Sequence, residues 1–194
     1  MGHLENKMEW CLNKAKKEGE KHRGLKEVSS NKEKADNHIK KAEHNFKAML
    51  HLIKGNFPDW AVSASFYSRY HCLLAILAKH GYESRNQECT FAAVEYLIKN
   101  KKIELDIEQL KKISSFEENM NEENIVKLRE DFQYGTDVEV EDEKMKELKE
   151  DTKKFIEVAK AVVVLVAMSS LRCASRLPRS RPASSIRFCA VSRD

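Results

Sequence analysis

Glycine and proline are scarce in this chain of 194 residues, which holds six glycines and three prolines. An architecture of many β-strands needs turn residues far more often, so the scarcity excludes it and favours helices. Long apolar runs are also missing, because the stretch at 161–168 is far shorter than the roughly 20 residues of a membrane span. The polar N-terminus shows no signal peptide. These absences predict a cytoplasmic protein with no membrane partner.

The common catalytic and metal-binding motifs are missing as well. The sequence contains no glycine-rich phosphate loop, no HExxH and no GxSxG. Cys11, Cys72 and Cys89 show neither CxxC nor CxxH spacing, so neither a zinc site nor a redox pair is expected. His44 and His51 could share a helix face but have no carboxylate at ligand spacing. We therefore expect no metal and no cofactor, and we favour a protein that is not an enzyme.

The net charge of +4 is distributed unevenly. Residues 169–194 contain six arginines and one acid, which gives +5 (six minus one) and leaves −1 for residues 1–168 (four minus five). The body is nearly neutral, so the overall charge is no evidence for nucleic-acid binding. We interpret 169–194 as an Arg-rich tail outside the fold, either disordered or derived from a vector, with a basic RNA-binding arm as the alternative.

Apolar residues recur at steps of three and four through most of the body, which is typical of amphipathic helices. The pattern predicts an all-α fold, an antiparallel up-and-down bundle of four to five main helices with short additional helices. Residues 1–29 are expected to form an N-terminal helix and a mobile arm, and residues 30–168 the bundle. The predicted helices cover 5–18, 30–54, 58–80, 89–100, 106–118, 122–133 and 141–168, with Ser30 and Glu33 as a capping box and Asn121 as a further cap.

Two polar residues stand out in the apolar segment 58–81, because an unpaired charge there is costly to bury. One interpretation pairs Arg69 with an acid on a neighbouring helix and bonds His71 to a backbone or hydroxyl group. In the other, Tyr67, His71 and Arg69 line a polar pocket that an anion such as phosphate enters.

Arg129, late in a predicted helix, has a similar ambiguity. It suits the helix dipole at that end, and it could form a charge network with Glu130 and Asp131. Alternatively, with Tyr134 following it, Arg129 belongs to a binding site.

Residues 30–163 resemble a HEPN domain (higher eukaryote and prokaryote nucleotide-binding) of the small, free-standing archaeal and bacterial type. The resemblance rests on four segments, KADNHIKKAEHNFKAML, AVSASFYSRYHCLLAILAKHG, ESRNQECT and LREDFQYGTDVEV. It implies a helical bundle, usually a homodimer, that often pairs with a minimal nucleotidyltransferase in toxin–antitoxin modules. Active members are metal-independent ribonucleases with an Arg-x(4–6)-His motif.

The resemblance aligns Arg129 with the arginine of that motif, but no histidine follows it in the sequence. Tyr134 stands near the required position, and tyrosine is a poor base at neutral pH although a good hydrogen-bond donor to phosphate. Gln87 occupies a loop position where relatives often carry histidine. The set of Arg129, Tyr134, Tyr67 and Arg85 is therefore better suited to holding a phosphate than to cutting RNA.

We therefore hypothesise a HEPN-like module that binds nucleotide or RNA phosphate, or docks a nucleotidyltransferase, through residues drawn from Arg129, Tyr134, Tyr67, Arg69, His71 and Arg85. One alternative is a ribonuclease toxin with a variant site, in which Arg129 acts with His71 as the base. A structural dimeric scaffold is the further alternative.

Overall fold

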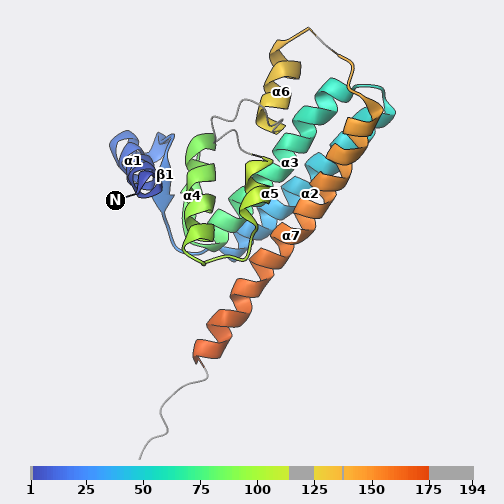
Figure 1. Ribbon diagram of the computed structural model, residues 1–194. Helices are drawn as coiled ribbons and strands as arrows, with labels where there is room; N and C mark the ends of the chain where they lie inside the picture. The colour runs from blue at the N-terminus through green and yellow to red at the C-terminus, as the bar shows by residue number, and fades with distance from the viewer. Residues whose placement is uncertain (1, 114–124, 137, 175–194) are drawn as a thin grey trace, which may run out of the picture.

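A computed structural model describes residues 2–113, 125–136 and 138–174, with side chains described as far as residue 164 (Figure 1). These residues form seven α-helices and one two-stranded antiparallel sheet, which confirms the predicted all-α fold. The helices are α1 (His3–Glu18), α2 (Lys32–Lys54), α3 (Pro58–Lys79), α4 (Gln87–Lys99), α5 (Ile107–Lys111), α6 (Ile125–Tyr134) and α7 (Asp142–Ala174). The strands are β1 (Leu25–Glu27) and β2 (Tyr82–Ser84), and a 3₁₀ turn covers Gly19–Lys21.

Helix α3 lies at the centre of the bundle, as its nearly continuous apolar sequence predicts. It packs against α2, α4, α6 and α7, and α2 and α7 run beside it over much of its length (Figure 1). Pro58 begins α3 at a position where the missing N–H costs nothing. Its apolar residues are buried on several sides, among them Val62, Phe66, Leu73 and Ile76. The buried polar groups Ser65, Ser68 and Arg69 of α3 therefore find their partners on the helices that cover them, α2 and α7.

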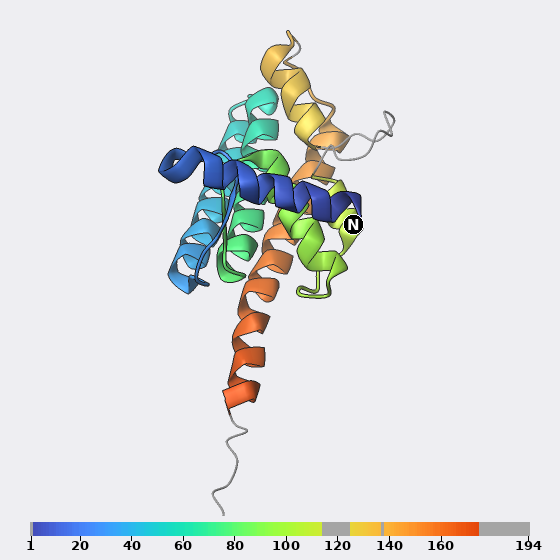
Figure 2. The same cartoon turned by 90° about the vertical axis from the view of Figure 1, so that its left-hand side faces the viewer.

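The N-terminal segment differs from the expected mobile arm. Helix α1 lies crosswise over the other helices and packs on α4 (Figure 2). A disulfide joins Cys11 on α1 to Cys89 on α4, a pairing that the search for CxxC and CxxH spacing did not predict. After α1, Leu25 is fully buried and β1 pairs with β2. A disulfide between residues 78 apart leaves no local spacing signal in the sequence.

The start of α2 also differs from the prediction. Asn31 caps the helix, because its side-chain oxygen accepts a hydrogen bond from the backbone N–H of Lys34 at 2.8 Å. The hydroxyl of Ser30 instead donates to the carbonyl of Lys79 at 2.6 Å, which ties the start of α2 to the end of α3. The capping box of Ser30 and Glu33 is therefore replaced by a cap one residue later.

At the other end of the chain, α7 continues to Ala174, past the predicted boundary at 168. The interpretation of 175–194 as part of a tail outside the fold, and the cap at Asn121, lie outside the described residues. Among the helices that the structure describes, none combines the length and the apolar character needed to cross a bilayer.

Candidate functional site

Arg69 is a buried cation on the face of α3 that α7 covers. Only 4% of the residue is exposed. Its Nε donates to the hydroxyl of Thr152 at 3.1 Å, and one of its terminal nitrogens donates to the carbonyl of Leu148 at 3.2 Å. Of the two interpretations that the sequence left open, the pairing with an acid is not the one found: no carboxylate among the described residues lies within ion-pair distance of Arg69.

The electrostatics of Arg69 follow from this burial. Desolvation lowers its pKa to about 10, and the more distant carboxylates of Asp151 and Glu147 act in the opposite direction. At neutral pH the guanidinium is therefore still charged. Asp151 forms its ion pair with Lys112, at 3.5 Å. Arg69 is thus a buried cation held by neutral acceptors, which leaves its charge available to an anion.

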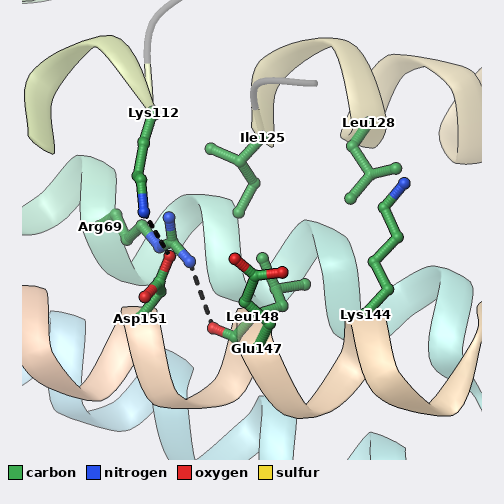
Figure 3. Close-up of a pocket in the computed structure, with 8 residues that line it drawn as sticks. All are labelled: Arg69, Lys112, Ile125, Leu128, Lys144, Glu147, Leu148 and Asp151. Atoms are coloured by element: carbon green, nitrogen blue, oxygen red, sulfur yellow. Dashed lines mark hydrogen bonds and ion pairs between the residues drawn. The ribbon is translucent and has the colours of Figure 1, made fainter. Parts of the chain in front are cut away.

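A cavity of about 130 Å³ opens beside Arg69, between α3, α6, α7 and the end of α5 (Figure 3). Arg69 stands at one end of it, with Lys112 above and the side chains of α7 below (Figure 3). Its lining combines three cations, two acids and three apolar residues: Arg69, Lys112, Lys144, Glu147, Asp151, Ile125, Leu128 and Leu148. The excess of one positive charge and the small volume suit a group of the size and sign of a phosphate.

Arg129 lies on α6, against the same side of α3. Its guanidinium carbon sits 4.5 Å from the centre of the Phe66 ring, in the geometry of a cation–π contact. One terminal nitrogen also bonds to Glu130 at 3.1 Å, while the buried Nε has no hydrogen-bond partner in the part of the chain that the structure describes. Phe66 and Arg69 are three residues apart on α3, hence neighbours on its surface. The fold therefore places the two arginines about one helical turn apart.

His71 lies elsewhere, at the contact between α2 and α3. Its Nδ1 is 3.1 Å from the Nδ1 of His38, and the two rings stack with their centres 5.3 Å apart. Burial, the neighbouring His38 and Lys41 lower the pKa of His71 to about 4, and burial also lowers the pKa of His38. Both rings are therefore neutral at pH 7, and one donates a hydrogen bond to the other. The expected bond of His71 to a backbone or hydroxyl group is replaced by this pair.

Among the described residues, the remaining candidates form no hydrogen bond with either arginine. Tyr67 and Tyr134 are exposed, by 46% and 78%. Arg85 lies after β2, where its side chain bonds to Glu83 and to the carbonyl of Glu20. Within the described residues, the structure thus brings Arg69 and Arg129 to one side of α3, with the centre of the Tyr67 ring 5.2 Å from that of the Phe66 ring, and gives His71 and Arg85 other partners.

Several residues of the site were not among the candidates from the sequence. The hydroxyl of Thr152 accepts from Arg69 and bonds to Ser65, and Lys112 and Lys144 line the cavity. Thr152 could have been found from the sequence, because it is a polar residue within the apolar stripe of the 141–168 segment. The lysines gave none, because 25 lysines are spread over the body. Metal ligands were not expected, and among the described residues no group of three or more His, Cys, Asp or Glu could hold a metal ion.

The histidine pair predicts a pH dependence of stability. The pKa of His71 lies below its ordinary value of 6.5, so the unfolded chain takes up protons that the folded chain refuses. The stabilisation of the folded state by neutral His71 is complete above pH 6.5 and is lost as the pH falls towards 4. We expect a loss on the order of 1–2 kcal/mol in the free energy of unfolding, discounted because the ring is only partly buried.

Urea unfolding of the wild type and of His71→Gln, followed by circular dichroism between pH 7.5 and pH 4.5, measures this effect. The variant should show a flatter pH profile. The profile should not become flat altogether, because burial also lowers the pKa of His22 and His80. His51→Gln, at an exposed position of α2, is the control. Parallel profiles for wild type and His71→Gln would contradict the assignment.

Comparison with known proteins identifies the family to which the chain belongs. A family model described as HEPN domain matches residues 35–162, well over half of the chain. The matched region runs from the first turn of α2 into α7 and contains both arginines and the cavity. No curated protein shows a significant match to the chain.

Proposed function

Because this chain belongs to the HEPN domain family, we propose that it is a helical module that binds the phosphate of a nucleotide or of RNA, without ribonuclease activity. The observation that carries the proposal is Arg69, a buried guanidinium that borders a small cavity and has no carboxylate partner among the described residues. A phosphate oxygen would supply the missing counter-charge. Arginine is the side chain best suited to this, because its planar fork matches the oxygens of phosphate.

Arg129 supports the proposal from the neighbouring helix. Its cation is held over Phe66 and, in the described part of the chain, has one exposed carboxylate partner, Glu130. An RNA backbone with one phosphate at Arg69 would place another phosphate near this second cation, about one helical turn away. Two arginines on fixed helices give an electrostatic binding site without a general base.

Binding without hydrolysis is favoured over the ribonuclease alternative by the positions of the histidines. Proton transfer needs a base within hydrogen-bond reach of the reacting oxygen. His71 is paired with His38 at the α2–α3 contact, whereas Arg129 contacts Phe66 and Glu130. These separate partners do not support Arg129 and His71 as one catalytic pair.

Our proposals for the oligomeric state, the partner and the location follow from the family. Because HEPN domains commonly dimerise, we propose a homodimer in the cytoplasm, with a minimal nucleotidyltransferase of a toxin–antitoxin module as a further partner. The disulfide between Cys11 and Cys89 is the one observation against this location, because the cytoplasm keeps most thiols reduced. A purely structural dimeric scaffold is the outcome if no ligand binds.

The test is the binding of a short fluorescein-labelled single-stranded RNA, followed by anisotropy at several salt concentrations. Lys112→Ala and Arg129→Ala should each weaken binding several-fold and reduce the salt slope by about one, as expected for one lost phosphate contact. Arg69→Met should weaken it roughly tenfold, with circular dichroism to confirm that the variant folds. The control is Lys153→Ala, an exposed lysine of α7 that does not line the cavity.

Two results would count against the proposal. One is the absence of measurable binding to RNA, ATP and AMP in isothermal titration, which would leave the scaffold alternative. The other is RNA binding that responds equally to Lys153→Ala and to the three cavity and α6 variants, which would indicate a non-specific surface contact. Release of 2′,3′-cyclic phosphate ends from RNA would show that the protein is a ribonuclease.

A further inference from the structure

A second cavity, of about 190 Å³, lies between the beginning of α3 and the end of α6. The two helices meet near the top of the molecule in Figure 1. The cavity is lined by one exposed aromatic ring, one partly buried aromatic ring, several polar groups and a short turn: Trp60, Phe132, Asp59, Ser63, Gln133, Gly135, Thr136 and Val138. It shares no lining residue with the cavity at Arg69.

Trp60 is the unusual member of this lining. Its residue is 61% exposed, although an indole is among the side chains that gain most from burial. The other tryptophan, Trp10, is also exposed but has the ammonium groups of Lys7 and Lys14 over its ring, at 4.8 and 4.9 Å. No ring or cation contact of Trp60 is found among the described residues. Its face is therefore available for another planar group.

The polar groups of the cavity are equally available. Among the described residues, the side chains of Asp59, Ser63, Gln133 and Thr136 form no hydrogen bond or ion pair. Together they offer a carboxylate, two hydroxyls and an amide, which can both donate and accept. An aromatic ring combined with unpaired donors and acceptors is the combination that recognises a nucleobase, by stacking on its face and hydrogen bonding to its edge.

The register of α3 connects this cavity with the two arginines. Ser63 lines it, Phe66 lies under Arg129, and Arg69 stands in the first cavity. These residues follow one another at steps of three, so each step advances about 4.5 Å along the helix axis. Helix α6 follows the same order in reverse, with Phe132 and Gln133 at the second cavity, Arg129 in the middle and Leu128 and Ile125 at the first.

We infer that the cavity at Trp60 takes an unpaired base that carries an exocyclic amine, such as adenine, stacked on the indole, of the nucleotide or RNA whose phosphates lie at Arg129 and Arg69. This inference rests on the proposed function. The carboxylate of Asp59 is an acceptor for the exocyclic amine of such a base, whereas it would repel a phosphate in the same place. The base therefore belongs at the Trp60 end and the phosphates at the Arg69 end.

The experiment uses the Trp10→Phe variant, in which Trp60 is the only tryptophan and reports on its own cavity. Its fluorescence is titrated with a short oligoadenylate, with an abasic ribose-phosphate oligomer of equal length, with AMP and with ribose 5-phosphate, and binding of each is measured in parallel by isothermal titration. We expect oligoadenylate to quench Trp60 and to bind roughly tenfold more tightly than the abasic oligomer. A response to oligoadenylate but not to AMP identifies RNA as the source of the base, and a response to both identifies a nucleotide site.

The matched variant is Trp60→Leu, which should fold because the indole is largely exposed. It should lose roughly tenfold in affinity for oligoadenylate and nothing for the abasic oligomer. Equal binding of both oligomers without quenching overturns the base cavity and leaves phosphate binding intact. Failure of both oligomers, AMP and ribose 5-phosphate to bind overturns the proposed function together with this inference.

Discussion

Replacing Cys11 and Cys89 together by alanine will lower the free energy of unfolding by about 4 kcal/mol. The disulfide closes a loop between residues 78 apart, and the chain-entropy model gives a stabilisation of about this size for such a loop. Both cysteines are fully buried, so the variant also loses some packing between α1 and α4. Urea unfolding, followed by circular dichroism, measures the change.

The controls separate the cross-link from the packing. Denaturant curves of the wild type in the presence of a reductant should approach those of the double variant, whose own curves should not respond to the reductant. Cys72→Ala, at a buried cysteine with a free thiol, removes a similar volume without breaking a disulfide and should cost less. If oxidised and reduced wild type unfold at the same urea concentration, the disulfide does not stabilise the fold.

The second large effect concerns the hydroxyl of Thr152, which holds Arg69 in place. This hydroxyl donates to the carbonyl of Leu148 at 2.7 Å, so its single proton is used. It therefore accepts from Ser65, at 2.6 Å, and from the Nε of Arg69, at 3.1 Å. All three groups at the centre of this network are buried. One hydroxyl thus satisfies two buried donors from α3.

Thr152→Val keeps the shape of the side chain and removes all three hydrogen bonds. It leaves a charged N–H and a hydroxyl buried without their acceptor, so we expect a loss of about 3 kcal/mol in the free energy of unfolding. Thr152→Ser keeps the hydroxyl, loses one methyl group and should cost only about 1 kcal/mol. The measurement is urea unfolding of both variants at pH 7.

A double-mutant cycle with Arg69→Met tests the assignment of this loss. Once the guanidinium is gone, Thr152→Val no longer leaves a charged donor unsatisfied, so the double variant should be more stable than the sum of the two single effects predicts. Strict additivity would mean that Thr152 and Arg69 do not interact. The same cycle in the RNA-binding assay would show whether this network also positions Arg69 for a phosphate.

The fold class follows from the order of residues alone, because the apolar residues follow helical spacing and turn residues are few. The segment 58–81 was identified as the central helix because an apolar surface on all sides requires neighbours on all sides. The family resemblance, too, was readable from four segments, and the match over residues 35–162 confirms it. These properties depend on local pattern, which the order of residues records directly.

Which side chains meet depends on how whole helices pack, and no local pattern in the sequence records that packing. Cys11 and Cys89 pair because α1 crosses α4, and Arg69 meets Thr152 because α7 covers one face of α3. Arg69 and Arg129 come together over α3, whereas His71, two residues from Arg69, points to α2 and pairs with His38. Residues two apart on a helix face different neighbours, and the packing of whole helices decides what those neighbours are. The fold therefore divides the candidates from the sequence, and the proposed phosphate site rests on the two arginines between α3, α6 and α7.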